Sequence, residues 1–61
     1  MKYFVIDQST LGVVSEHRSM LAAIGNADVW VGLEMGRRAY VIRQYPSGKQ
    51  VNIYQSPRVE A

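Results

Sequence analysis

The sequence contains no cysteine, a single histidine and only two prolines. The absence of cysteine excludes a disulfide framework and a thiolate metal site, and one histidine nearly excludes an ordinary zinc site. No apolar run approaches the roughly 18 residues of a membrane span, and the apolar block 3–6, ended by Asp7, is too short for a signal peptide. We therefore expect a cytoplasmic protein that has no membrane segment, no metal and no other cofactor.

The chain has 61 residues, of which 48% are apolar and 20% are charged. A chain of this size buries only about 60% of the surface that its unfolded form exposes, so its core must be thin. We expect one domain over residues 1–55 and a flexible tail over residues 56–61, where a proline follows Ser56. A thin core makes a protein partner, and in particular a homodimer, an attractive source of further stability.

Charge is distributed unevenly along the chain. Residues 1–36 contain two basic and four acidic side chains, a balance of −2, whereas residues 37–61 contain five basic and one acidic, a balance of +4. The basic C-terminal half permits a polyanionic partner, although the net charge of +2 is too small to indicate one.

Two pairs of β-rich segments indicate two hairpins. Residues 38–45 and 50–55 flank the turn Pro46-Ser47-Gly48-Lys49, and residues 2–8 and 13–16 flank a shorter polar turn.

The alternation within each hairpin predicts which side chains face the core. A four-residue loop pairs Tyr45 with Gln50 and Ile42 with Ile53. The second hairpin then places Tyr40, Ile42, Val51 and Ile53 on the inner face and Val41, Arg43, Tyr45, Asn52 and Tyr54 on the opposite one. In the first hairpin Phe4, Ile6 and Val13 form a better inner face than Tyr3, Val5 and Val14.

Between the hairpins, apolar residues recur at helical spacing. Ser19 is a suitable N-cap and Gly36 a suitable residue after the end, so the pattern predicts a helix over residues 20–35. The alternative interpretation ends the helix at Gly25 and makes 29–35 a strand, since valine and tryptophan alternate there. The helical interpretation gives a small α+β domain with the order ββαββ: an antiparallel sheet of two hairpins, with one helix packed on one face.

No arrangement of residues in the sequence indicates catalysis. His17 lies close to Ser15, Glu16 and Ser19, but neighbours along a strand point to opposite faces and so small a domain has little depth for a pocket. The acidic residues lack metal-binding spacing, and the glycines form no phosphate loop. We therefore expect a protein that is not an enzyme.

One group of residues in the helical segment suggests a contact surface. After one face of the helix covers the sheet, Val29, Trp30 and Leu33 still project elsewhere, and apolar side chains exposed together mark contact surfaces. The sequence is also compatible with a broad sheet that wraps further around the helix, and with an edge strand in this segment that needs a partner strand.

A second group lies on the hairpin face predicted to point away from the helix. Arg43, Tyr45 and Tyr54 combine a cation with flat aromatics, as do sheets that hold single-stranded bases, although these residues are also ordinary on a solvated strand. At the ends of the hairpin, Arg37, Arg38 and Lys49 could contact phosphates.

The first functional hypothesis is a small non-enzymatic protein-binding module that self-associates through Val29, Trp30 and Leu33 and regulates or inhibits a larger protein by occupying its surface. Bacteriophages and bacteria encode many proteins of this size, which is an association of size with source alone. The alternative hypothesis is a nucleic-acid-binding module that uses the basic and aromatic hairpin face.

Overall fold

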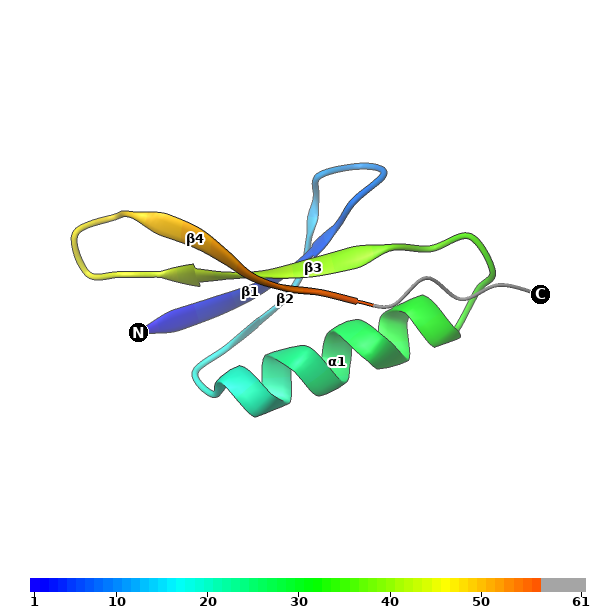
Figure 1. Cartoon of the computed structure of the whole chain (residues 1–61), viewed down its shortest axis with the longest axis horizontal. Coiled ribbons are helices and arrows are strands. Elements are labelled where there is room, and N and C mark those ends of the chain that lie inside the picture. Colours follow the sequence, from blue (N-terminus) through cyan, green and yellow to red (C-terminus); the bar gives the residue numbers. More distant parts are fainter. Residues whose placement is uncertain (57–61) are drawn as a thin grey trace.

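The computed structural model describes residues 1–56 and shows a four-stranded antiparallel sheet with one helix on one face (Figure 1). This arrangement confirms the predicted ββαββ fold of the α+β class. The elements are β1 (Lys2–Asp7), β2 (Val13–His17), α1 (Met20–Gly32), β3 (Ala39–Gln44) and β4 (Gln50–Gln55).

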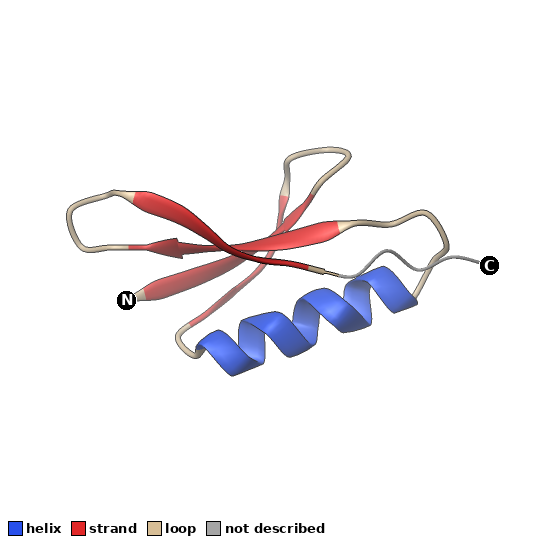
Figure 2. Cartoon of the chain, viewed as in Figure 1, coloured by secondary structure: helices blue, strands red, loops and turns tan. Residues whose placement is uncertain are grey.

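The first strand of each hairpin lies at the centre of the sheet. The strand order is β2-β1-β3-β4, and all three neighbouring pairs are antiparallel. Figure 2 shows the hairpins diverging from their crossing while the helix runs along one side of it. In the described part of the chain, the opposite face of the sheet therefore has no covering layer, and we call it the open sheet face.

The helix is present but shorter than predicted. Ser19 caps its start, where the side chain accepts a hydrogen bond from the Ala22 N–H at 3.4 Å. It ends at Gly32, with Leu33 as the C-cap, instead of continuing to residue 35. The chain turns back towards β3 through Gly36, whose φ of +86° is the left-handed conformation that glycine adopts readily. The alternative strand over 29–35 is therefore wrong.

The turn between β3 and β4 is also shorter than predicted. The Tyr45 N–H donates to the Lys49 carbonyl at 2.8 Å, and Gly48, with φ of +91°, donates to the Tyr45 carbonyl at 2.9 Å. These bonds close a three-residue loop instead of a four-residue one. Gln50 consequently pairs with Gln44, one residue away from the predicted pairing with Tyr45.

The predicted inner face is wrong for β1, β2 and β3. Val5 and Val41 are fully buried beneath the helix, whereas Tyr40 and Ile42 lie on the open sheet face. The predicted inner residues of the first hairpin, Phe4, Ile6 and Val13, also lie on the open sheet face. Val51 lies on the helix side but is 36% exposed, and of the predicted inner residues Ile53 alone packs against the core.

A β-bulge interrupts the register of each hairpin. The register shifts leave Val14 and Ile53 without a partner directly opposite, so two residues on one strand oppose one on the other. Each extra residue changes which alternate positions face the helix beyond it. Tyr54 consequently shares the helix side with Val41.

The core under the helix is built from small side chains. The helix contributes Ala23, Ala27 and Val31, each at most 1% exposed. The sheet contributes Val5, Ala39 and Val41. Larger residues pack only partly against this cluster, namely Tyr3, Val14, Ile24, Trp30, Ile53 and Tyr54.

The fold extends one residue into the predicted tail. Ser56 is buried, its N–H donates to the Ala39 carbonyl at 2.9 Å, and its hydroxyl donates to Asp28 Oδ1 at 2.9 Å. The rest of the predicted tail, residues 57–61, lies outside the described residues.

Candidate protein-contact surface

The outer side of the helix carries almost no polar groups. Over its 13 residues only Asn26 and Asp28 have polar side chains, apart from the partly buried Trp30, and Asp28 is its single charge. Surface helices ordinarily place charged and polar residues on the side away from the core. This helix is therefore apolar on both sides.

The two polar side chains lie at the edges of the outer side and are bonded to the sheet. Asn26 Oδ1 accepts a hydrogen bond from the Ser15 hydroxyl of β2 at 3.0 Å. At the opposite edge, Asp28 Oδ1 accepts from the Tyr54 hydroxyl and the Ser56 hydroxyl, each at 2.9 Å. These bonds direct the polar groups towards the sheet.

Between these edges lies the surface that we call the outer helix face. Leu21, Val29 and Leu33 are 77%, 62% and 68% exposed. The small residues between them are Ala22, Gly25 and Gly32, which are also exposed. A contiguous uncharged surface of this kind is typical of a protein contact.

Of the three helix residues singled out from the sequence, Val29 and Leu33 belong to this face and Trp30 does not. The Trp30 indole N–H donates to Asp7 Oδ2 at 3.2 Å, and its ring packs partly against the core. The Arg37 guanidinium lies 3.9 Å from the centroid of the ring and forms a 2.9 Å ion pair with Glu34. Trp30 therefore ties the end of the helix to the end of β1.

Leu21 is the residue of this face that sequence reasoning missed. It lies eight residues before Val29, and with Gly25 and Leu33 it completes a row at four-residue spacing along the helix. Such a row forms a continuous ridge on a helix surface. The four-residue spacing is visible in the sequence, but Gly25 interrupts the apolar residues of the row, so Leu21 was not assigned to it.

The aromatic and basic residues predicted to share the hairpin face away from the helix do not lie together on that face. The Tyr54 hydroxyl is bonded to Asp28, and this bond, with burial, raises the pKa of Tyr54. Arg43 also points to the helix side, where Nη2 donates to Met20 Sδ at 3.6 Å and the guanidinium lies 5.5 Å from the Tyr3 ring centroid. The wrong parity of the hairpin explains both corrections.

The other basic candidates lie at different ends of the molecule. Arg37 and Arg38 precede β3, whereas Lys49 lies at the far end of the same hairpin, in the turn before β4. A six-residue strand spans roughly 20 Å, so these cations do not converge on one site.

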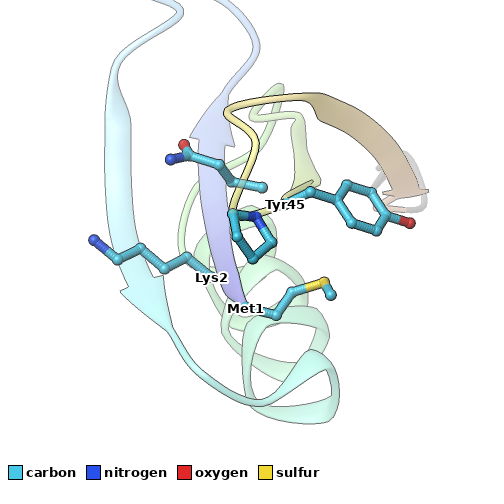
Figure 3. Close-up of a pocket in the computed structure, with 5 residues that line it drawn as sticks. Met1, Lys2 and Tyr45 are labelled. Carbon is cyan, nitrogen blue, oxygen red and sulfur yellow. The ribbon is translucent and has the colours of Figure 1, made fainter.

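Tyr45 lines a shallow depression of about 270 Å³ at the end of the sheet (Figure 3). Met1, Lys2, Gln44 and Pro46 complete its lining. Figure 3 shows the Lys2 ammonium and the Tyr45 hydroxyl pointing away from each other. A catalytic or ligand site needs converging polar groups, and this depression does not provide them.

His17 does meet a potential nucleophile. Its Nε2 lies 2.8 Å from the Ser15 hydroxyl, because both residues face the same side of β2. The same hydroxyl donates to Asn26 Oδ1 of the helix at 3.0 Å. The contact therefore joins β2 to the helix.

The open sheet face carries apolar residues on the two central strands. Phe4 lies opposite Ile42, and Ile6 lies opposite Tyr40. Ile6 is buried and the other three are half-buried. Amide side chains lie on the β4 side of this face, those of Gln44, Gln50, Asn52 and Gln55.

No family model matches the sequence, and the searches of curated proteins and of solved structures likewise found no match. Among residues 1–56, no group of three or more histidine or acidic side chains is placed to hold a metal ion. The only helix of that region is too short to cross a membrane.

Proposed function

We propose that this protein is a small non-enzymatic protein-binding module, which regulates or inhibits another protein by occupying part of its surface. The outer helix face carries the proposal. Leu21, Val29 and Leu33 are exposed together on a helix whose polar side chains are bonded to the sheet. In water this surface is unfavourable, and a protein contact would remove it from solvent.

The chemistry of this face favours protein over nucleic acid as its partner. Binding to a phosphate backbone requires cations, and the helix from residue 20 to residue 32 contains none. Arg37, the nearest candidate after the helix, is paired with Glu34 and stacked on Trp30. Exposed leucine and valine instead match the apolar centre of a protein interface.

A capture experiment with matched variants tests the proposal. Tagged protein is incubated with a bacterial cell lysate, with and without nuclease. We expect nuclease-resistant capture of a defined protein, which Val29→Glu abolishes because the charge would lie in a desolvated contact. Val13→Glu is the control, since Val13 is 61% exposed, close to the 62% of Val29, but lies on the other side of the sheet. Equal loss with both variants would contradict the proposal.

A second candidate function, single-stranded nucleic-acid binding, now rests on the open sheet face. Phe4 and Tyr40 lie there on adjacent central strands, next to amide groups that could bond to base edges. Flat rings on an open sheet are suitable for stacking of bases.

Salt dependence tests this second candidate. Binding of a single-stranded oligonucleotide should weaken as salt rises, with a slope of roughly −0.7 per phosphate contact. Phe4→Ala should cost about 1–3 kcal/mol of binding free energy per lost stack. Affinity no tighter than about 10⁻⁴ to 10⁻⁶ M at physiological salt would be non-specific and would remove this candidate.

A further inference from the structure

We propose that the outer helix face binds the same face of a second copy of this chain, with the two helices antiparallel. The inference rests on the proposed function and specifies its partner. It places Leu21, Gly25, Val29 and Leu33 in the contact and leaves Trp30 out of it.

Two copies of the helix that run in opposite directions place complementary residues opposite each other. In an antiparallel pair centred at the level of Ala27, residues equally far from that level lie opposite each other. Leu21 then lies opposite Leu33, and Gly25 lies opposite Val29, because each pair is equally spaced about residue 27. A symmetric dimer uses one patch twice, so it requires this kind of self-complementarity.

The shape of the face fits the packing of two helices. The four residues form one ridge at four-residue spacing, and ridges of this kind run side by side when helices cross at about −50°. Ala22 and Gly32 flank the ridge and leave room for the ridge of the partner. In the middle of the ridge, the glycine of one helix faces the valine of the other, so the two helix axes can approach closely. The leucines at both ends then meet each other.

Close packing within residues 1–56 does not require either helix glycine. A Cβ added at Gly25 or Gly32 would meet nothing within 4 Å. Glycine disfavours a helix relative to alanine, so two glycines in one helix weaken it without improving the packing of the chain on itself. Opposite the Val29 of a second copy, the missing side chain of Gly25 provides the space that valine needs.

The charges at the helix ends favour the antiparallel direction. Arg18 precedes the helix and is exposed, and within residues 1–56 no acidic side chain forms an ion pair with it. Glu34 follows the helix. Glu34 is already paired with Arg37 of its own chain, so the contribution of Arg18 rests on the helix ends: antiparallel helices bring Arg18 of one copy towards the negative helix end of the other, whereas parallel helices would bring like helix ends together.

The dimer would leave both open sheet faces uncovered. Each helix lies between its own sheet and the helix of the partner, so the sheets form the outer layers. A standard interface removes about 800 Å² from each partner, which is about a fifth of the 4096 Å² surface of this chain. A larger protein that binds the outer helix face would then compete with the second copy for it.

Sedimentation analysis of the full chain tests the proposal. We expect mass to rise from one chain towards two between about 1 and 500 micromolar, as for a reversible dimer. Val29→Glu should weaken association at least about tenfold, while Val13→Glu leaves it unchanged. A monomer at all concentrations, or equal effects of the two variants, would overturn the dimer. Circular dichroism verifies that both variants remain folded.

Cysteine cross-linking tests the direction, since the natural chain has no cysteine. The variants Leu21→Cys and Leu33→Cys are oxidised separately and as a mixture. Antiparallel pairing predicts that the mixture forms the mixed disulfide faster than either variant forms its own, because position 21 lies opposite position 33 of the partner. Faster formation of the two symmetric disulfides would overturn the antiparallel arrangement.

The experiments can disprove the dimer without disproving the proposed function. If the chain stays monomeric while Val29→Glu still abolishes capture of a protein from the lysate, the dimer is wrong and the protein-binding function stands. If Val29→Glu changes neither association nor capture, both are wrong.

Discussion

The two sides of the helix differ in the size of their apolar residues: the small ones are buried and the large ones are exposed, whereas large apolar residues are usually the buried ones. The inner side consists of Ala23, Ala27 and Val31, which are buried, whereas the outer side presents Leu21 and other large residues to solvent. Small inner residues allow the helix to approach the sheet closely, which is how a thin layer of valines and alanines can exclude water.

This difference shows which apolar side chains could still gain free energy by burial after one chain has folded. Burying a leucine or valine side chain is worth about 1.5–3 kcal/mol, and the fold of a single chain leaves Leu21, Val29 and Leu33 mostly unburied. The inner side serves the stability of the chain. The outer side has no comparable role within one chain, and the proposed association would account for its composition.

The largest expected effect comes from enlarging the inner side. Ala27→Leu should lower the free energy of unfolding by about 1–3 kcal/mol, because extra methylenes cannot fit between the helix and the sheet. Ala22→Leu is the matched change on the outer side and should alter it by less than about 0.5 kcal/mol. Urea titration at low micromolar protein, where a weak dimer dissociates, measures both. Equal destabilisation would remove the distinction between the two sides.

A smaller effect of opposite sign is expected at the centre of the outer side. Gly25→Ala should stabilise the single chain by up to about 1 kcal/mol, since alanine favours the helix and has free space there. The same change should weaken the dimer, because the new methyl group meets the Val29 of the partner. Gly36→Ala is a useful contrast. It should destabilise the chain, because its φ of +86° disfavours any residue with a Cβ.

The edge of the helix next to β4 should respond to alkaline pH. Bonding to Asp28 and burial raise the pKa of Tyr54 above its usual value of 10.0, so the native state favours the protonated phenol. This contribution to stability is fully present below pH 10 and is lost as pH rises through the higher native pKa. Tyr54→Phe should remove that part of the alkaline loss, measured by thermal unfolding. Tyr40→Phe, on the open sheet face, is the control.

The smallest expected effect lies at the end of the helix next to β1. Hydrogen bonds from the side chain and backbone of Ser9, and further ones from Thr10 and Trp30, lower the pKa of Asp7 below 3.8. Its contribution is present above pH 3.8 and is lost as pH falls through the lower native value. Asp7→Asn should therefore reduce the acid dependence of stability below pH 4. An unchanged acid limb would show that these bonds do not persist in solution.

Much of the architecture could be predicted from local patterns in the sequence. Ser19 marks the start of the helix, Gly48 marks the second turn, and the β-rich segments lie where the strands are found. Each depends on interactions within a few residues, such as a cap that accepts a backbone N–H or a glycine with positive φ. Val29 and Leu33 were identified as exposed for the same reason, since helical spacing fixes which residues share a face.

The faces of the strands were not predictable in this way. Both alternations in residues 3–6 are apolar, so Tyr3 and Val5 compete with Phe4 and Ile6 for the inner position. The bulge in β4 also places both Val51 and Tyr54 on the helix side, although the two residues are three positions apart. The position of Trp30 also depended on distant partners, because Asp7 and Arg37 approach it only after the sheet and helix have packed.

The sequence by itself therefore determined the order ββαββ, the caps and turns, and an apolar helix with a row of exposed residues. Only the tertiary structure decided which side of the sheet the helix covers. The helix presents alanines and a valine, and it packs on the sheet face that offers Val5, Ala39 and Val41, where close approach is possible. Tyr3 and Tyr54 pack only partly against this cluster, so the fully buried residues between helix and sheet are all small, and the alternation with Phe4 and Tyr40 is left on the open sheet face.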